Sequence, residues 1–191
     1  MSKKVLFAAL LAVATVFGVS AQKLTGNLSP LKGQEQVNVV IDFSGTTVNG
    51  KAEKVFIANE TRRMKEADKE KWLKEWNENL RSQAHELFAV EVNRNLKNQT
   101  FSVGNYPDAE YTINVKVLDI KPGSFMPVSR SSALKVEVNF VGKDGKSFAN
   151  IPYKTISNPG SSVIPVLVTR IAMSYGALGV SVAAVMNRNL K

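Results

Sequence analysis

The 191-residue chain has no cysteine, one histidine and two tryptophans. Without cysteine it has no disulfide framework, and it has no thiol that could carry a lipid at an export cleavage site. One histidine without cysteine is a poor basis for a zinc site. For an exported chain, the absence of disulfides favours the periplasm of a double-membraned bacterium over a eukaryotic secretory route.

The first residues indicate export. Lys3 and Lys4 precede a largely apolar run of 15 residues, Val5 to Val19, and the small residues Ser20 and Ala21 follow. This pattern is typical of a cleaved signal peptide, and it is shorter than the roughly 20 apolar residues of a bilayer span. We expect residues 1–21 to be removed and the product to be periplasmic or secreted.

Basic residues outnumber acidic ones. Removing Lys3 and Lys4 leaves 23 Lys and Arg residues against 16 Asp and Glu residues, a net charge of +7. Positive charge aids solubility and also favours anionic lipid headgroups, lipopolysaccharide or acidic polymers as partners. Nucleic acid is not an expected partner in that compartment.

The chain after the signal peptide divides into two parts. Residues 22–36 mix Gly, Pro and polar residues without a period and predict a flexible leader. Residues 37–191 are enough for a single domain with one core. Residues 37–43 alternate apolar and polar positions as a half-buried strand does, and residues 44–63 predict a loop with a small hairpin at Asn49-Gly50.

A stretch of more than thirty residues, 65–99, has neither glycine nor proline and predicts a long helix. Apolar residues recur at every fourth position, which favours one face packed on a sheet. These residues are Trp72, Trp76, Leu80, Ala84, Phe88, Val92 and Leu96. The two tryptophans fit the core, and an exposed aromatic platform for a sugar or peptide is the alternative.

Residues 100–156 alternate in the manner of strands. A short strand at 100–103 is followed by a three-stranded antiparallel meander over 110–156, with a hairpin at Asp144-Gly145. The predicted fold class is therefore α+β: a mixed or mainly antiparallel sheet of about five strands, with a long central helix and a C-terminal helix packed on it.

The last 35 residues return to helical spacing. Small residues lie together on one side of this helix and predict a close-packing or subunit-contact face. They are Ala172, Gly176, Gly179 and Ala183. The uncharged stretch from Ile171 to Met186 is 16 residues long, which favours a buried or subunit-facing helix and leaves peripheral membrane contact as the alternative.

No constellation for catalysis is visible in the sequence. His85 lies in the middle of the long helix, and residues 142–147, GKDGKS, lack the earlier glycine and the strand-to-helix context of a phosphate-binding loop. We predict no catalytic residue, no metal ligand and no cofactor.

Several short motifs resemble a known group. They include Phe101 and Val103, then Ala109-Glu110-Tyr111 at a strand start, and Asp119 with Pro122-Gly123 at its end; Arg130 and the Asp144-Gly145-Lys146 hairpin follow. In these the chain resembles exported bacterial domains of unknown function related in design to the amino-terminal domain of TolB and to the periplasmic part of the curli secretion subunit. The resemblance implies an α+β domain acting in envelope assembly or transport. The chain differs from this group, whose members are often lipoproteins, because it has no cysteine that could carry the lipid.

The connection at residues 121–133 joins two strands that two residues could have joined, and long connections often serve binding. Its candidate partner-binding residues are Phe125, Met126, Ser129, Arg130 and Ser131. They offer apolar contact, a forked cation and hydroxyl groups. The alternative is a structural ion pair between Arg130 and Asp119.

These observations predict a non-enzymatic periplasmic binding or assembly module of the cell envelope. Its partner would be an envelope protein or an anionic envelope polymer. One alternative is a homo-oligomeric structural subunit that touches a membrane through its C-terminal helix. The other is an enzyme whose anionic substrate is held by Arg130.

Overall fold

The computed structural model describes residues 23–97 and 99–191, so the predicted signal peptide lies outside the described residues. The helices are α2 (Glu53–Thr61), α3 (Glu66–Lys74), the π-helical turn η2 (Glu75–Asn79), α4 (Leu80–Asn95) and α5 (Leu167–Asn189), with short 3-10 turns η1 (Ser29–Leu31) and η3 (Pro159–Val163). The strands are β1 (Thr25–Gly26), β2 (Gln36–Asp42), β3 (Thr47–Val48), β4 (Lys51–Ala52), β5 (Ser102–Gly104), β6 (Tyr111–Lys121), β7 (Ala133–Gly142) and β8 (Ser147–Ser157).

The predicted meander is confirmed. Strands β6, β7 and β8 pair antiparallel, and Gly145 takes a φ of +79° in the β7–β8 turn, where its N–H donates to the carbonyl of Gly142 at 2.9 Å. The alternation of buried and more exposed side chains breaks near the end of β6, because the pairing register with β7 shifts between Val117 and Asp119. Ile120, rather than Asp119, therefore enters the core.

The sheet is mixed, in the order β1-β8-β7-β6-β2-β5. Strand β2 runs parallel to both β6 and β5. The parallel pairing with β5 follows from the long helix, which carries the chain back along the sheet before β5 begins. The β3–β4 hairpin, predicted at Asn49-Gly50, joins the far end of β6.

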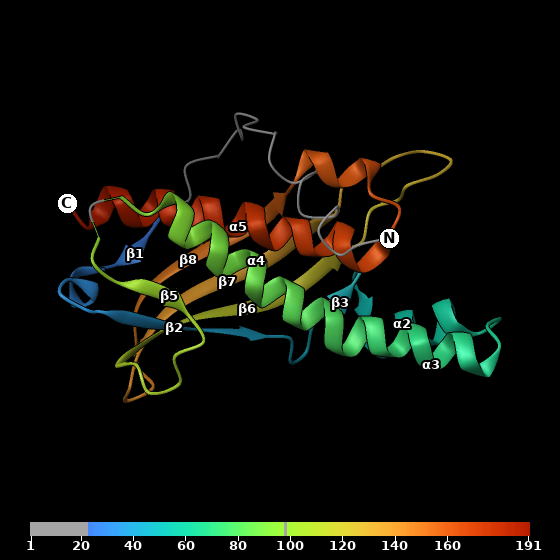
Figure 1. The fold of residues 1–191 in the computed structure, drawn as a ribbon, viewed down its shortest axis with the longest axis horizontal. Helices are drawn as coiled ribbons and strands as arrows, with labels where there is room; N and C mark the ends of the chain where they lie inside the picture. Colours follow the sequence, from blue (N-terminus) through green and yellow to red (C-terminus); the bar gives the residue numbers. More distant parts are fainter. Residues whose placement is uncertain (1–22, 98) are drawn as a thin grey trace, which may run out of the picture.

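Helices cover one face of this sheet, which confirms the predicted α+β class (Figure 1). The segment α3-η2-α4 forms one continuous helix, and α5 lies beside α4 with its C-terminus at the same end. The predicted stripe of Trp76, Leu80, Ala84, Phe88 and Val92 is buried. Trp72 stacks on Trp76 with ring centroids 5.5 Å apart and packs against the core, so the aromatic-platform alternative is wrong.

The prediction of a flexible leader at residues 22–36 is wrong for its described part. Strand β1 pairs with β8, and Leu28 and Leu31 have no exposed surface. Isolated leucines among glycines and prolines carry no periodic signal, so their burial depends on contacts with distant segments.

The loop predicted over residues 44–63 contains a helix, α2. Phe56 lies on it and packs its ring 5.0 Å from the ring of Trp76. Glu53 begins the helix and accepts a hydrogen bond from Trp76 Nε1 at 2.7 Å. These contacts come from the distant helix, which is why the local sequence did not reveal α2.

Candidate functional site

The connection between β6 and β7 closes on a short base. Ser124 and Arg130 exchange backbone hydrogen bonds of 3.0 and 2.8 Å as an isolated bridge. Gly123 has a φ of +69°, and a Cβ there would collide with the backbone of Arg130 and Ser131. The crossing of the two chain segments at the base therefore requires glycine at this position.

A buried arginine joins this base to the start of α5. The Arg170 side chain donates from Nε to the carbonyl of Pro122 at 2.9 Å and from Nη1 to the carbonyl of Ile164 at 2.7 Å. Burial lowers the pKa of Arg170. Within the described residues no carboxylate pairs with it, so its charge is balanced by carbonyl dipoles.

Three buried serines complete the attachment. The N–H of Ser132 donates to Ser161 Oγ at 2.9 Å, and the hydroxyls of Ser132 and Ser174 lie 2.7 Å apart. Ser174 also donates to the carbonyl of Ser132 at 3.1 Å. The 121–133 connection, η3 and α5 are thus held together by polar groups that water does not reach.

Above this polar base, apolar side chains face solvent. Phe125, Met126 and Val128 are 39%, 73% and 59% exposed. Val163, which ends η3, and Val166, which caps the start of α5, are 67% and 56% exposed. We call Phe125, Met126 and Val128 the apolar tip. The sequence predicted Phe125 and Met126 as partner-binding residues, but not Val128 of the same connection. Val163 and Val166 were missed because nothing in the sequence places residues 163–166 beside residues 121–133.

The predicted polar residues of the connection divide into two groups. Ser129 donates its hydroxyl to the carbonyl of Phe125 at 2.7 Å, and Ser131 donates to the carbonyl of Pro159 at 3.2 Å. Both hydroxyls thus donate within the chain, and their oxygen lone pairs remain able to accept a hydrogen bond from a partner. Arg130 is exposed, as a binding cation must be.

The alternative ion pair between Arg130 and Asp119 does not form. Asp119 Oδ1 instead accepts hydrogen bonds from Thr47 Oγ1 at 2.6 Å and from the N–H of Gly50 at 2.9 Å. Asp119 therefore fixes the β3–β4 hairpin, and within the described residues Arg130 has no carboxylate at ion-pairing distance.

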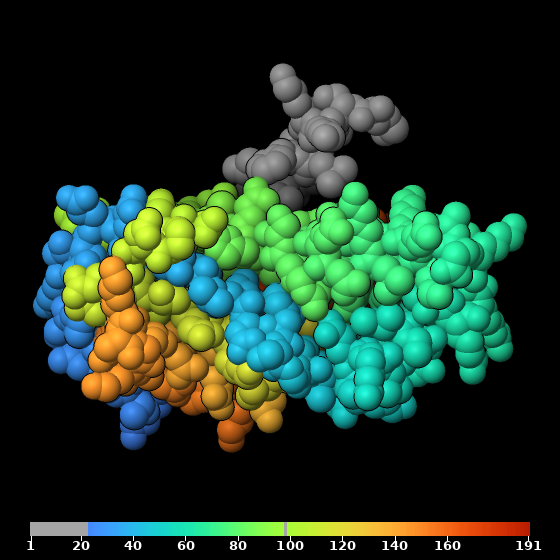
Figure 2. All heavy atoms as spheres, turned by 90° about the horizontal axis from the view of Figure 1, so that it is seen from below, coloured from blue at the N-terminus to red at the C-terminus, as the bar shows by residue number. Residues whose placement is uncertain are grey.

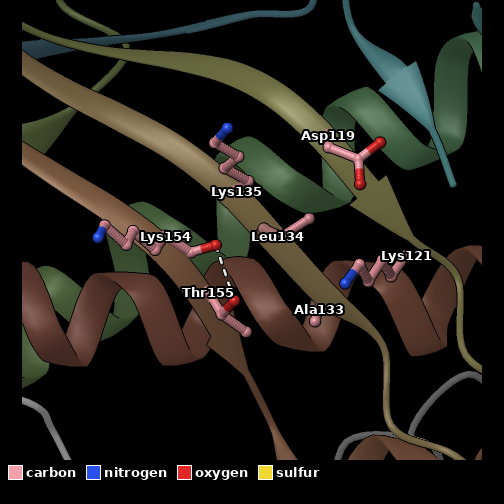
Figure 3. Close-up of a pocket in the computed structure, with 7 residues that line it drawn as sticks. All are labelled: Asp119, Lys121, Ala133, Leu134, Lys135, Lys154 and Thr155. Carbon is pink, nitrogen blue, oxygen red and sulfur yellow. Dashed lines mark hydrogen bonds between the residues drawn. The ribbon is translucent and has the colours of Figure 1, made fainter. Parts of the chain in front are cut away.

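Three lysines lie on the uncovered face of the sheet, next to the base of the connection (Figure 3). Lys121 ends β6, Lys135 lies two residues into β7, and Lys154 comes from the neighbouring part of β8. All three side chains are exposed around a small depression that Asp119 also lines. We call Lys121, Lys135 and Lys154 the lysine cluster.

A wider groove of about 530 Å³ follows the free edge of β2 beyond the point where β5 ends. Figure 2 shows this side of the molecule, with the green of α4 above the light blue of β2. Its charged groups are engaged within the chain: Arg81 pairs with Glu53 at 3.1 Å, and Asp42 pairs with Lys116 at 2.7 Å. His85 Nε2 lies 3.3 Å from the carbonyl oxygen of Val39.

Hydrogen bonds from Lys116 and Ser44 lower the pKa of Asp42 to about 2. The Asp42 carboxylate is therefore held ionised. No second Asp or Glu is among the described residues that line the groove. Among residues 23–97 and 99–191, no three His, Cys, Asp or Glu side chains are grouped as metal ligands.

The predicted small-residue face lies inside the molecule. A Cβ on Gly179 would stand 2.5 Å from the carbonyl oxygen of Phe88, and Gly176 faces the side chains of Glu91 and Leu87 on α4. Ala172 and Ala183 are fully buried. This face packs on α4 of the same chain and is not available to another subunit.

Membrane contact through α5 is likewise wrong for the folded chain. Its 23 residues are long and apolar enough to span a bilayer, but 78% of the apolar window is buried within the protein. The helix has the character of a core helix.

No protein-family model matches the chain, and no curated protein is significantly similar to it in sequence. Among solved structures it is similar to the PelC dodecamer from Paraburkholderia phytofirmans, with a TM-score of 0.45 and 9% identity over 83% of this chain and 96% of that chain. Protein XCC0632 from Xanthomonas campestris, of the family DUF330, gives a TM-score of 0.36 and 5% identity over 88% and 93%. Likenesses this distant carry no argument about function, and the resemblance to the TolB and curli-secretion group stays a prediction.

Proposed function

We propose that this protein is a non-enzymatic module of the bacterial cell envelope, exported to the periplasm, which binds another envelope component through the end of the molecule formed by residues 121–133 and 163–166. The observation that carries the proposal is the contrast at this end between a hydrogen-bonded base, held by the buried Arg170 and serines, and an exposed apolar tip. A chain gains nothing in stability by holding Met126 in water, so such a tip is typical of a contact surface.

The charge of this end supports the same reading. Arg130 forms part of the base and the lysine cluster lies next to it on the uncovered face of the sheet, while the nearby Asp119 is bound to the β3–β4 hairpin. An envelope component that carries phosphate or carboxylate groups would meet a complementary surface here. Homo-oligomerisation stays a prediction, and it would need a surface other than the buried small-residue face.

Co-sedimentation with isolated envelope membranes tests the proposal. The purified mature chain is compared with Met126→Ser and with Val90→Ser, whose side chain is 41% exposed on α4, away from the tip. We expect wild type and Val90→Ser to sediment with the membranes and Met126→Ser to remain mostly in solution. Equal behaviour of the three proteins, with all folded by circular dichroism, would contradict the proposal.

A further inference from the structure

The apolar tip lies on a projecting loop. The connection between β6 and β7 projects beside η3 and the start of α5, at the end of the molecule where α2 and α3 also lie and reach further (Figure 1). Its turn is closed by the bridge between Ser124 and Arg130 and by a hydrogen bond from Ser124 Oγ to the carbonyl of Val128. The turn is thus closed at its base, and the carbonyls of Val128 and Phe125 accept the hydroxyls of Ser124 and Ser129 within it.

Cations flank the tip in the sequence. Arg130 lies two residues after Val128, and Lys121 ends β6 four residues before Phe125; both are exposed. A surface that touches the tip therefore has these two cations nearest to it, and Lys135 lies further back, two residues after Ala133.

From these two features we infer that this end of the molecule is a peripheral docking surface for an anionic lipid bilayer. Phe125, Met126 and Val128 enter the interface, and the lysine cluster with Arg130 faces the headgroups. The inference rests on the proposed function and specifies its partner: the envelope component is the lipid surface itself.

The shape of the end favours a bilayer over a protein partner. Tight protein interfaces place aromatic and arginine anchors in well-packed, water-free pockets. Here single apolar side chains protrude from a narrow loop and cations flank them in the sequence, which is the arrangement of proteins that lie on a membrane through a shallow apolar insertion aided by basic residues.

The experiment is flotation of the full mature chain with phosphatidylcholine vesicles, with and without phosphatidylglycerol. The charge test compares Lys121→Glu/Lys135→Glu with Lys143→Glu/Lys146→Glu, which makes the same charge change in the β7–β8 turn at the opposite end of β7. The apolar test compares Met126→Ser with Val90→Ser. Thermal unfolding confirms that each variant folds.

We expect binding to vesicles that contain phosphatidylglycerol and little binding to pure phosphatidylcholine. Since one basic residue near an anionic surface contributes roughly fivefold to binding, the double change at Lys121 and Lys135 should reduce it by well over tenfold. Met126→Ser should also weaken it severalfold, and both control variants should bind as wild type does.

Two results would overturn the inference: no binding to anionic vesicles, or an equal loss in the matched controls. If the chain sediments with native envelope membranes through Met126 but does not float with lipid vesicles, the proposed function stands and its partner is not lipid. If it binds neither, both fail.

Discussion

At the scale of single residues, the buried guanidinium of Arg170 joins the two segments that form the exposed end. One side chain bonds the carbonyls of Pro122 and Ile164, which are 42 residues apart in sequence. The planar fork of arginine suits this bridging, whereas the ammonium of lysine is a compact point charge on a flexible stem. The position therefore requires arginine specifically.

Arg170→Lys should lower the free energy of unfolding by about 2 kcal/mol, because at least one buried carbonyl loses a charged donor. It should also speed hydrogen exchange at the amides of Ser124 and Arg130, which close the base of the connection. Chemical denaturation and exchange measurements check both effects. Arg188→Lys, at an exposed position on the same helix, is the control, and an equal loss there would contradict this role for Arg170.

Also at residue scale, Asp42 predicts a pH effect. Its folded pKa of about 2 lies below the ordinary value of 3.8, so its ionised form is the one that stabilises the fold. That contribution is complete above pH 3.8 and is lost as the pH falls through about 2. Asp42 and Lys116 are each about a third exposed, so solvent screening limits the contribution to less than about 1 kcal/mol.

Lys116→Met should therefore raise the pKa of Asp42 toward its ordinary value. The pKa is measured from the pH dependence of the NMR chemical shift of the Asp42 carboxyl carbon. The variant should be slightly less stable than wild type at pH 7, and the difference should shrink as the pH approaches 2. The control is Lys146→Met, which removes the ion-pair partner of Asp144. This pair is more exposed than the pair of Asp42 and Lys116, so stability should not change. A pKa of Asp42 that does not move would refute the assignment.

At the scale of elements, the packing of α5 on α4 depends on one glycine more than on the other. A Cβ on Gly179 would meet the backbone of α4, 2.5 Å from Phe88 O and 3.2 Å from Val92 N, and backbone cannot move aside cheaply. A Cβ on Gly176 would meet only side-chain atoms at ordinary contact distances, Glu91 Cγ at 3.5 Å and Leu87 Cβ at 3.9 Å. Two glycines three residues apart thus have different roles.

Gly179→Ala should destabilise the protein by roughly 2 kcal/mol or more, because the two helices must separate. Gly176→Ala should be neutral or stabilising by up to about 1 kcal/mol, since alanine is the better helix former. Thermal and denaturant unfolding of the pair provide the comparison. Similar effects at both positions would mean that the close approach of α5 to α4 is wrong.

How much of the fold could be predicted from the sequence differs from one element to another. Alternation and the Asp144-Gly145 turn were sufficient for β6, β7 and β8, and four-residue spacing was sufficient for the long helix and α5. These signals are local. The burial of Leu28 and Leu31, the helix α2 and the parallel pairing of β2 with β6 depend on contacts between distant segments, which no local pattern encodes.

The candidate site shows the same division. The length of the 121–133 connection revealed a surface feature, and its sequence revealed Phe125, Met126 and Arg130. That Val163 and Val166 lie at the same end follows from Arg170 and the serine contacts, which only the folded chain brings together. The small residues of α5 were correctly seen as a close-packing face, but a periodic pattern does not tell whether the neighbour is another subunit or another helix of the same chain.

At the scale of the whole molecule, the two ends of the sheet differ in character. One end carries the apolar tip and the lysine cluster, and the other carries the polar β7–β8 turn with Lys143, Asp144 and Lys146 exposed. The core between them is built from the covered face of the sheet and the two long helices. The molecule is therefore polarised, and in the function proposed above it meets the envelope with the end that bears the tip.

The most direct test of this claim uses the absence of cysteine, since a single introduced thiol can be labelled without any other change. An environment-sensitive fluorophore is attached to Met126→Cys or, as the control, to Val90→Cys, and isolated envelope membranes are added. The account predicts that emission shifts to shorter wavelength at position 126 and stays unchanged at position 90. No shift at 126, or the same shift at both positions, would contradict it.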